Sequence, residues 1–214
     1  MKIRIAHEVP GTRLRAKHRL DTRRTAHHFS AMSDEKPPLP PRENIILIGF
    51  MGSGKSTVGR MLAKHLRFQF IDTDRLLEER SRMTIKDMFA RHGEAAFRER
   101  ETATLESLHG IRRHVLATGG GIVTQPRNPP ILRSLGWVVQ LSADPDELYA
   151  RVAKSTDRPL LQTENPRELI HAMLADRQPM YDAACDFTVN STGLARERVV
   201  DVIMAEAHRV FGWE

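Results

Sequence analysis

The chain has 214 residues, 40% of them hydrophobic, which is enough for one domain with its own core and too few for two typical domains. Residues 1–30 carry eight Lys or Arg side chains against Glu8 and Asp21, so this segment accounts for the whole formal charge of +6. Residues 43–214 are therefore neutral overall, and the basic composition is poor evidence that the folded body binds nucleic acid.

The sequence also argues against membrane insertion and disulfide bonding. No run approaches the roughly 18 apolar residues of a membrane span, and the N-terminus lacks the apolar stretch of a secretory signal. One cysteine, Cys185, excludes an internal disulfide bond and is expected to be a small buried side chain. The histidines show no paired ligand spacing, so no structural metal is expected. The single cysteine suits the reducing cytoplasm, and we expect a monomer because the strands and helices use up the apolar positions.

Residues 1–42 lack helical or strand periodicity and run into "EKPPLPPRE", whose consecutive prolines favour an extended backbone. We expect a disordered, basic leader. The favoured interpretation is a dispensable extension, with Met32 as the true initiator, because Ser30 is the only serine in the first thirty residues and plastid leaders are rich in serine. An organelle-targeting peptide and an anion-binding arm remain open alternatives.

From residue 44 the sequence alternates between short apolar strands and helices. Strands are expected at residues 44–49, 68–72, 114–118, 137–141 and 186–189. Single helices are expected at residues 55–66, 145–154 and 194–210, more than one helix is expected within residues 73–109, and the proline pair of "NPPIL" suits the start of another. Apolar strands separated by helices indicate a parallel sheet covered on both faces. The expected fold is a doubly wound, five-stranded α/β domain over residues 43–214.

The first strand and helix enclose "GFMGSGKST", in which Gly49, Gly54, Lys55 and Ser56 complete the phosphate-loop pattern G-x-x-x-x-G-K-[ST]. Glycines let the chain turn tightly, so that successive N–H groups point at an anion while the helix adds its positive end. Lys55 is expected to reach the β and γ phosphates, and Ser56 to bind Mg²⁺. The loop therefore predicts a nucleoside triphosphate site, which also includes Gly52, Ser53 and Thr57.

The second strand ends in "IDTD", at the sheet edge where open parallel sheets bind their ligands. Asp72 and Asp74 are two residues apart, so one is able to face the nucleotide while the other faces an acceptor. We expect Asp74 to orient an alcohol in line with the γ phosphate and to take its proton. The alternative is that Asp74 only caps the helix that follows.

Two further motifs predict an acceptor site. In "FRERE", Arg98 and Glu101 are three residues apart on one helix face, which by itself is typical of a solvated ion pair. A carboxylate substrate favours a guanidinium, because two parallel N–H bonds fix its plane. The third strand then ends in Gly119, Gly120 and Gly121, which remove every side chain and let a ligand touch the backbone.

A polar, proline-marked segment, residues 154–166, lies between helices and suits a mobile lid. Arg158 within it is a candidate for stabilising the transferring phosphoryl group. Arg177, near the end of a helix, is a second candidate for binding an anionic acceptor.

Taken in order, "GFMGSGKST", "DTD", "FRERE", "TGGG", and "RPLL" followed by "RQPMY" resemble the shikimate kinase family, small P-loop kinases of the nucleoside monophosphate kinase superfamily. The resemblance covers about residues 44–210. It implies a P-loop NTPase fold and an enzyme that phosphorylates the 3-hydroxyl of shikimate to give shikimate 3-phosphate. ATP and Mg²⁺ are the implied cofactors, and the implied pathway is the chorismate route to aromatic amino acids.

The resemblance also implies a role for each matching position. Asp72 belongs to the outer shell of the metal, and Asp74 holds the acceptor hydroxyls and acts as the base. Arg98 and Arg177 clamp the shikimate carboxylate, while the three glycines line the ring. Arg158 meets the transferring phosphoryl group, and Arg151 stacks on adenine. Residues 1–42 inherit nothing, because compact family members begin almost at the first strand.

Three other functions are weaker interpretations of the same motifs. A gluconate-type sugar kinase shares the phosphate loop and the acid pair but is not expected to carry "FRERE" followed by a triple glycine. A nucleoside monophosphate kinase needs a base-recognition surface that the sequence does not indicate. An ATP-binding regulator, or a protein that binds nucleic acid through the basic residues 1–42, would give the expected acceptor residues no role.

Overall fold

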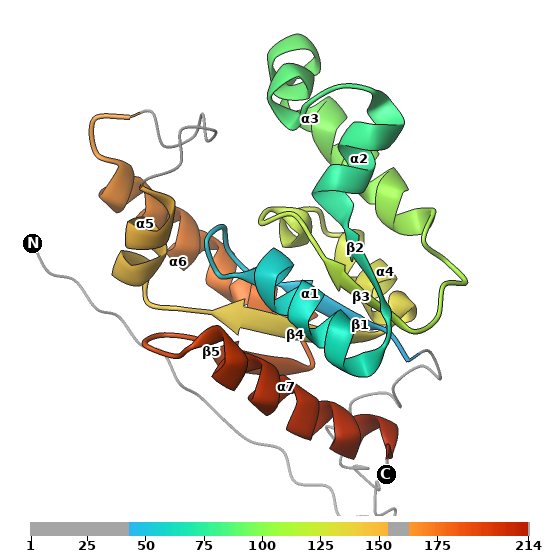
Figure 1. Cartoon of the computed structure of the whole chain (residues 1–214). Helices are drawn as coiled ribbons and strands as arrows, with labels where there is room; N and C mark the ends of the chain where they lie inside the picture. Colours follow the sequence, from blue (N-terminus) through green and yellow to red (C-terminus); the bar gives the residue numbers. More distant parts are fainter. Residues whose placement is uncertain (1–42, 154–162, 214) are drawn as a thin grey trace, which may run out of the picture. The chain divides into compact units, whose positions relative to one another are not determined.

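The computed structural model describes residues 43–153 and 163–213. Five strands, β1 (Ile45–Ile48), β2 (Gln69–Asp72), β3 (His114–Ala117), β4 (Trp137–Ser142) and β5 (Phe187–Asn190), form one sheet in the order β2-β3-β1-β4-β5. Every strand pair is parallel, so all the carboxyl ends meet at one edge of the sheet (Figure 1). The expected doubly wound five-stranded sheet is confirmed.

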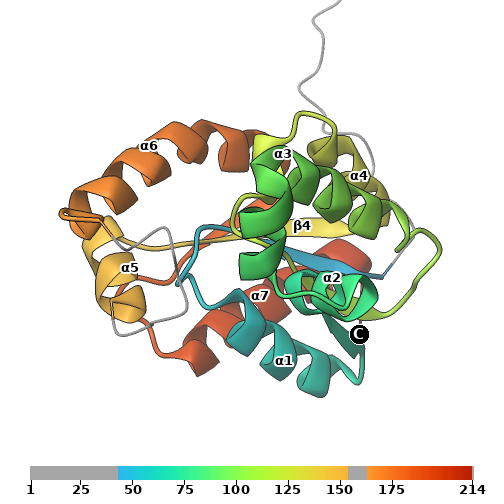
Figure 2. The same ribbon diagram turned by 90° about the horizontal axis from the view of Figure 1, so that it is seen from above.

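The helices of the described residues are α1 (Lys55–Leu66), α2 (Thr73–Ser81), α3 (Ile85–Glu106), α4 (Asn128–Leu135), α5 (Pro145–Val152), α6 (Pro166–Ala184) and α7 (Arg196–Phe211), with a short 3-10 helix, η1 (Ile122–Thr124). Seen from above, α1 and α7 cover one face of the sheet, whereas α4 and α6 cover the other (Figure 2). None of these helices is long and apolar enough to cross a membrane.

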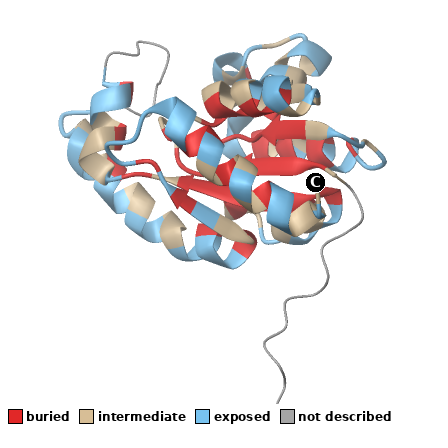
Figure 3. Ribbon diagram, turned by 60° about the horizontal axis from the view of Figure 1, so that its bottom comes forward, coloured by how far each residue is buried: buried red, intermediate tan, exposed pale blue. Residues whose placement is uncertain are grey.

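The central strand β1 is buried on both faces because its side chains alternate between two cores. Ile46 and Ile48 pack with residues of α3, α4 and α6, and Ile45 and Leu47 pack with residues of α1 and α7. All four side chains are fully buried. Buried residues fill the three inner strands, β3, β1 and β4, and the inward faces of the helices, while the outer helix faces are exposed (Figure 3). This rigid strand carries the phosphate loop at its end.

The helices expected within residues 73–109 are α2 and α3, whose boundaries the sequence did not give. Arg82 takes a left-handed conformation with φ 48° and ends α2. A kink interrupts α3 at Gly93, where φ is 75° and ψ is 176°, a conformation that essentially only glycine adopts. The prolines of "NPPIL" do begin a helix, α4, and Cys185 is buried as expected.

Two predictions concern residues that the structure does not describe. The expected leader, residues 1–42, lies outside the described residues, as do residues 154–162 of the expected lid. The domain boundary at residue 43 and the lid therefore stay predictions.

Candidate active site

The phosphate loop joins β1 to α1 at the carboxyl edge of the sheet (Figure 1). Gly49 has a φ of 136°, and a Cβ there would lie 2.3 Å from the carbonyl oxygen of Leu141, so only glycine fits. The Lys55 ammonium lies inside the turn and donates to the carbonyl oxygens of Gly49, at 2.7 Å, and Phe50, at 2.9 Å. Gly54 begins α1 without a side-chain cap, which leaves the helix end open to an anion.

Asp72 ties the phosphate loop to the second strand. The Ser56 hydroxyl donates to Asp72 Oδ2 at 2.7 Å, and Asp72 Oδ1 accepts from the backbone N–H of Asp74 at 3.2 Å. Asp72 is thus the N-cap of α2. The alternative interpretation of Asp74 as the helix cap is wrong, since the preceding strand places Asp72 in that position.

The Ser56 and Asp72 oxygens suit magnesium, which prefers hard oxygen ligands and keeps several waters. Within residues 43–153 and 163–213, no cluster of three or more His, Cys, Asp or Glu side chains forms a metal site by itself. A magnesium ion at Ser56 would therefore complete its shell from phosphate oxygens and water, as is usual for phosphoryl-transfer enzymes.

Asp74 sits in the first turn of α2 and faces the glycines that follow β3. A Cβ on Gly119 would lie 2.7 Å from Asp74 Oδ1 and 2.6 Å from Glu101 Oε1, so both carboxylates crowd the backbone of Gly119. Burial, followed by the charges of Glu101 and Asp72, raises the pKa of Asp74 to about 6, and the Lys55 charge lowers it by less. Such a pKa suits a base that must be ionised, yet still basic, near neutral pH.

Arg98 and Glu101 form a buried ion pair, with Arg98 Nη1 2.8 Å from Glu101 Oε2 and side-chain exposures of 9% and 3%. The alternative interpretation as a solvated pair is wrong, because α3 turns this face inward. Glu94 accepts a further bond from Arg98 at 3.1 Å. A Cβ on Gly121 would lie 2.4 Å from both terminal nitrogens of Arg98, so the guanidinium lies directly against the glycine backbone.

The charges of this pair shift both pKa values. Burial raises the pKa of Glu101 more than Arg98 lowers it. Burial lowers the pKa of Arg98, but Glu101 and Glu94 outweigh it, and the net shift is upward. Glu101 Oε1 has no hydrogen-bond partner within the described residues and is an open acceptor beside Asp74.

Helix α6 brings Arg177 to the same cluster. Its guanidinium lies 5.8 Å from the ring centroid of Phe50, in the phosphate loop. Its charge lowers the pKa of Glu101, but burial has the larger effect and the net shift of that pKa is upward. Tyr181, one turn later and fully buried, donates its hydroxyl to the carbonyl oxygen of Gly120. The structure thus brings Asp74, Arg98 and Arg177 together around Glu101 and the three glycines, beside Lys55.

A model of the shikimate kinase family matches residues 51–208 of this sequence. The chain belongs to the shikimate kinase family. It is 40% identical to the shikimate kinase of Thermodesulfovibrio yellowstonii over 168 residues, which cover 78% of this chain and 96% of the relative. It is 45% identical to the shikimate kinase of Geobacter metallireducens over 157 residues, which cover 73% of this chain and 87% of that relative.

Solved structures of shikimate kinases share the fold. The enzyme from Acinetobacter baumannii, in complex with shikimate, superposes with a TM-score of 0.73 at 38% identity, covering 76% of this chain and 91% of that one. The enzyme from Aquifex aeolicus gives a TM-score of 0.67 at 30% identity, and the match covers 79% of this chain and 99% of that one. A gluconokinase from Sinorhizobium meliloti, with a TM-score of 0.50 at 20% identity, shares the fold alone.

The nucleotide half of this shikimate kinase is bordered by Arg151 in α5. Its guanidinium approaches the carbonyl oxygen of Gly52 at 3.4 Å and the Ser191 hydroxyl at 3.3 Å, and it pairs with Glu147. Arg151 therefore lies next to the phosphate loop, away from the Asp74 cluster. Arg158, the expected partner of the transferring phosphoryl group, lies outside the described residues.

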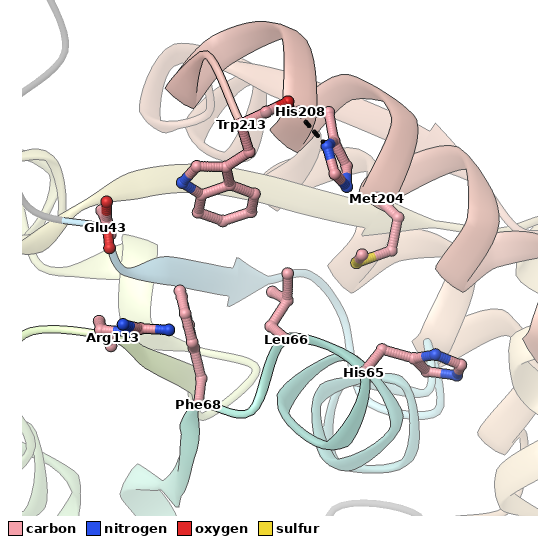
Figure 4. Close-up of a pocket in the computed structure, with 8 residues that line it drawn as sticks. All are labelled: Glu43, His65, Leu66, Phe68, Arg113, Met204, His208 and Trp213. Carbon is pink, nitrogen blue, oxygen red and sulfur yellow. Dashed lines mark hydrogen bonds between the residues drawn. The ribbon is translucent and has the colours of Figure 1, made fainter.

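A hollow of about 380 Å³ lies at the other edge of the sheet (Figure 4). Glu43, Phe68 and Arg113, which line it, each stand just before a strand, so the hollow is at the amino edge. Trp213 packs edge-on against Phe68, with ring centroids 5.7 Å apart. Ligands of open parallel sheets gather at the carboxyl edge, so we do not include this hollow in the kinase site.

Sequence reasoning missed two residues of the cluster. Glu101 was noted only as the partner of Arg98, and Tyr181 only as the end of "RQPMY". Each follows an expected site residue by one helical turn, Glu101 after Arg98 and Tyr181 after Arg177, which places the two members of each pair on one face. That spacing was a usable signal, but burial of the two faces is a tertiary property.

Proposed function

We propose that the cluster of Asp74, Arg98 and Arg177 beside the phosphate loop is the acceptor site of this shikimate kinase. The enzyme transfers the γ-phosphoryl group of ATP to the 3-hydroxyl of shikimate, giving shikimate 3-phosphate in the pathway to chorismate and the aromatic amino acids. The observation that carries the site assignment is that the half-buried Asp74 carboxylate and the buried Arg98 guanidinium lie against Gly119 and Gly121 of the same loop, near Lys55.

Asp74 orients the acceptor hydroxyl and takes its proton. With a pKa of about 6, the carboxylate is mostly ionised at neutral pH and accepts a proton more readily than an ordinary aspartate. Since phosphoryl transfer has a loose transition state, the proton moves late, and positioning is the larger part of this role.

Arg98 and Arg177 bind the shikimate carboxylate. Glu101 and Glu94 hold the Arg98 guanidinium in a fixed orientation, which favours bidentate binding of a planar carboxylate. The fixed geometry lowers the entropy that binding costs. The glycines let the ring lie against the backbone.

Lys55, Gly49, Gly52, Ser53, Gly54 and Thr57 hold the phosphates of ATP, and Arg151 packs on adenine. Ser56 would hold Mg²⁺ directly and Asp72 through its outer shell, and the ion would supply positive charge at the phosphate oxygens. Arg158 contributes positive charge to the transferring group from the lid. We also propose that the enzyme is a cytoplasmic monomer, with residues 1–42 as a dispensable leader.

An ADP-release assay with different acceptors tests this function. The purified chain is given ATP, Mg²⁺ and either shikimate, gluconate or a nucleoside monophosphate. We expect ADP release with shikimate alone. Release with gluconate instead would indicate a sugar kinase, and release with none of the acceptors would favour an ATP-binding regulator.

A further inference from the structure

We infer that Phe50 and Tyr181 are positioning residues for Arg177, which they hold in place to bind the carboxylate of the acceptor. This inference rests on the proposed acceptor site and adds to it the groups that fix its second arginine. Because both residues act through Arg177, their effect should appear only with an acceptor that carries a carboxylate.

Arg177 lacks the charged partners that hold Arg98. The Arg98 guanidinium pairs with two carboxylates, with Nη1 2.8 Å from Glu101 and Nη2 3.1 Å from Glu94. In the part of the chain that the structure describes, Arg177 by contrast forms no ion pair. Any fixed orientation of this long side chain therefore comes from uncharged neighbours.

Tyr181 contacts Arg177 through its hydroxyl. It follows Arg177 by four residues in α6, which places the two side chains on one face of the helix. The hydroxyl donates its one proton to the carbonyl oxygen of Gly120, so its lone pairs are left to accept a hydrogen bond from Arg177. Burial raises the pKa of Tyr181 to about 12, more than the Arg177 charge lowers it, and the hydroxyl stays protonated near neutral pH. Gly120 thus fixes the hydroxyl, and the hydroxyl fixes one edge of the guanidinium.

Phe50 contacts Arg177 through the face of its ring. The guanidinium carbon lies 5.8 Å from the ring centroid, and Phe50 is only 2% exposed. The negative face of an aromatic ring attracts a cation, most strongly where water is excluded. The ring is attached to a held backbone, because the Phe50 carbonyl oxygen accepts from the Lys55 ammonium at 2.9 Å. A ring face has no lone pair, so this contact leaves the N–H groups of Arg177 available to a ligand.

These contacts give the two arginines different roles at the carboxylate. The charge of Arg98 is offset by Glu101 and Glu94, so Arg98 mainly fixes the plane of the ligand. Arg177 is held by a neutral ring and a neutral hydroxyl, and within the described residues no ion pair offsets its charge. A guanidinium already held in place loses less conformational entropy on binding, so releasing it should weaken carboxylate binding.

The test is Tyr181→Phe, which removes the hydroxyl and keeps the ring, measured with shikimate and with its carboxamide, in which a neutral amide replaces the carboxylate. We expect the shikimate Kd and KM to rise by about 3- to 10-fold, the effect of one lost hydrogen bond. The Kd values of the carboxamide and of ATP should change less than about twofold. Tyr149, in α5, is the only other tyrosine of the sequence, so Tyr149→Phe is the control and should change none of these values.

Phe50→Leu is an independent second variant, because it keeps an apolar side chain and loses the ring face. We expect its shikimate Kd to rise by about 2- to 5-fold, again without a matching change for the carboxamide. Calorimetry measures the Kd values, and thermal unfolding shows whether each variant is folded. If Tyr181→Phe does not fold, Phe50→Leu gives the same comparison.

Equal weakening of shikimate and the carboxamide would overturn the inference, because the residue would then act through the Gly120 backbone or the fold and not through Arg177. An unchanged shikimate Kd in either folded variant would overturn the role of that residue. Failure of both variants to fold would also overturn the inference, since the two contacts would then support the whole structure. Absence of shikimate-dependent ADP release in the wild type would instead refute the proposed function.

Discussion

Asp74 shows how a single position acquires chemistry from its surroundings. An exposed aspartate has a pKa of 3.8, and burial, with the charges of Glu101 and Asp72, raises that of Asp74 to about 6. The folded protein therefore holds this proton more tightly than the unfolded chain. Its stability falls as the pH rises from about 4 to about 6, since ionising Asp74 inside the fold costs free energy. Activity should change in the opposite direction, because the base must be ionised.

Asp74→Asn is expected to separate these two effects. Turnover should fall by about 10²- to 10⁴-fold, because an amide cannot accept the proton. The free energy of unfolding at pH 7 should rise by about 1–2 kcal/mol, as a buried charge is removed. Steady-state kinetics and urea unfolding at pH 7 and pH 4 measure both quantities, and the stabilisation should shrink at pH 4. Near-normal turnover would remove Asp74 from the mechanism.

The raised pKa of Asp74 predicts how the kcat of the wild-type enzyme depends on pH. As the pH falls through about 6, Asp74 is protonated, and kcat should fall with it. Glu101 contributes to the raised pKa, so Glu101→Gln should move this acid limb to lower pH. A pH profile of kcat at saturating shikimate measures the limb. An acid limb that Glu101→Gln leaves in place would show that another group controls it.

Arg98 is expected to bind the shikimate carboxylate through two parallel N–H bonds from its planar guanidinium. Arg98→Lys keeps the charge but loses the bidentate geometry and the bond to Glu94, so the shikimate KM should rise by about tenfold or more, with little effect on the ATP KM. Arg91→Lys, at an exposed position of the same helix, is the control and should behave like the wild type. The assignment fails if both variants keep the wild-type shikimate KM.

At the scale of elements, the loop after β3 depends on the absence of side chains. A methyl on Gly121 would lie 2.4 Å from two nitrogens of Arg98, whereas one on Gly119 would crowd Asp74 and Glu101. Gly121→Ala should therefore raise mainly the shikimate KM, and Gly119→Ala should lower mainly kcat, each by about tenfold or more. Kinetics of the two variants side by side check this, and identical effects on both parameters would contradict it.

Helices α2 and α3 show that the spacing of apolar residues predicts helices but not where they end or kink. The sequence predicts more than one helix within residues 73–109 but not where they divide, and in the structure α2 ends at Arg82 and α3 kinks at Gly93. Both points are single residues with positive φ, which the spacing of apolar residues does not mark. The kink at Gly93 lies five residues before Arg98 in the same helix.

At the scale of the whole molecule, the two hydrophobic cores on the faces of the sheet use, within the described residues, side chains from Ile45 onward. A relative matched over 96% of its own length uses 78% of this chain. A chain that begins at Met32 should therefore keep its kcat, both KM values and its Tm nearly unchanged. Parallel kinetics and thermal unfolding of the two lengths test the leader proposal, and a loss of activity in the shorter chain would give the leader a role.

The sequence alone determined the sheet, the phosphate loop and the family, because these are recorded in local order: strand, glycines, lysine, helix, and five motifs in succession. The tertiary structure decided the state of individual side chains. Only the packing of α2 and α3 against the glycine loop half-buries Asp74 and fully buries the Arg98–Glu101 pair, and only the placement of α6 brings Tyr181 to Gly120. Burial and charge environment depend on residues distant in the chain, so a linear pattern does not contain them.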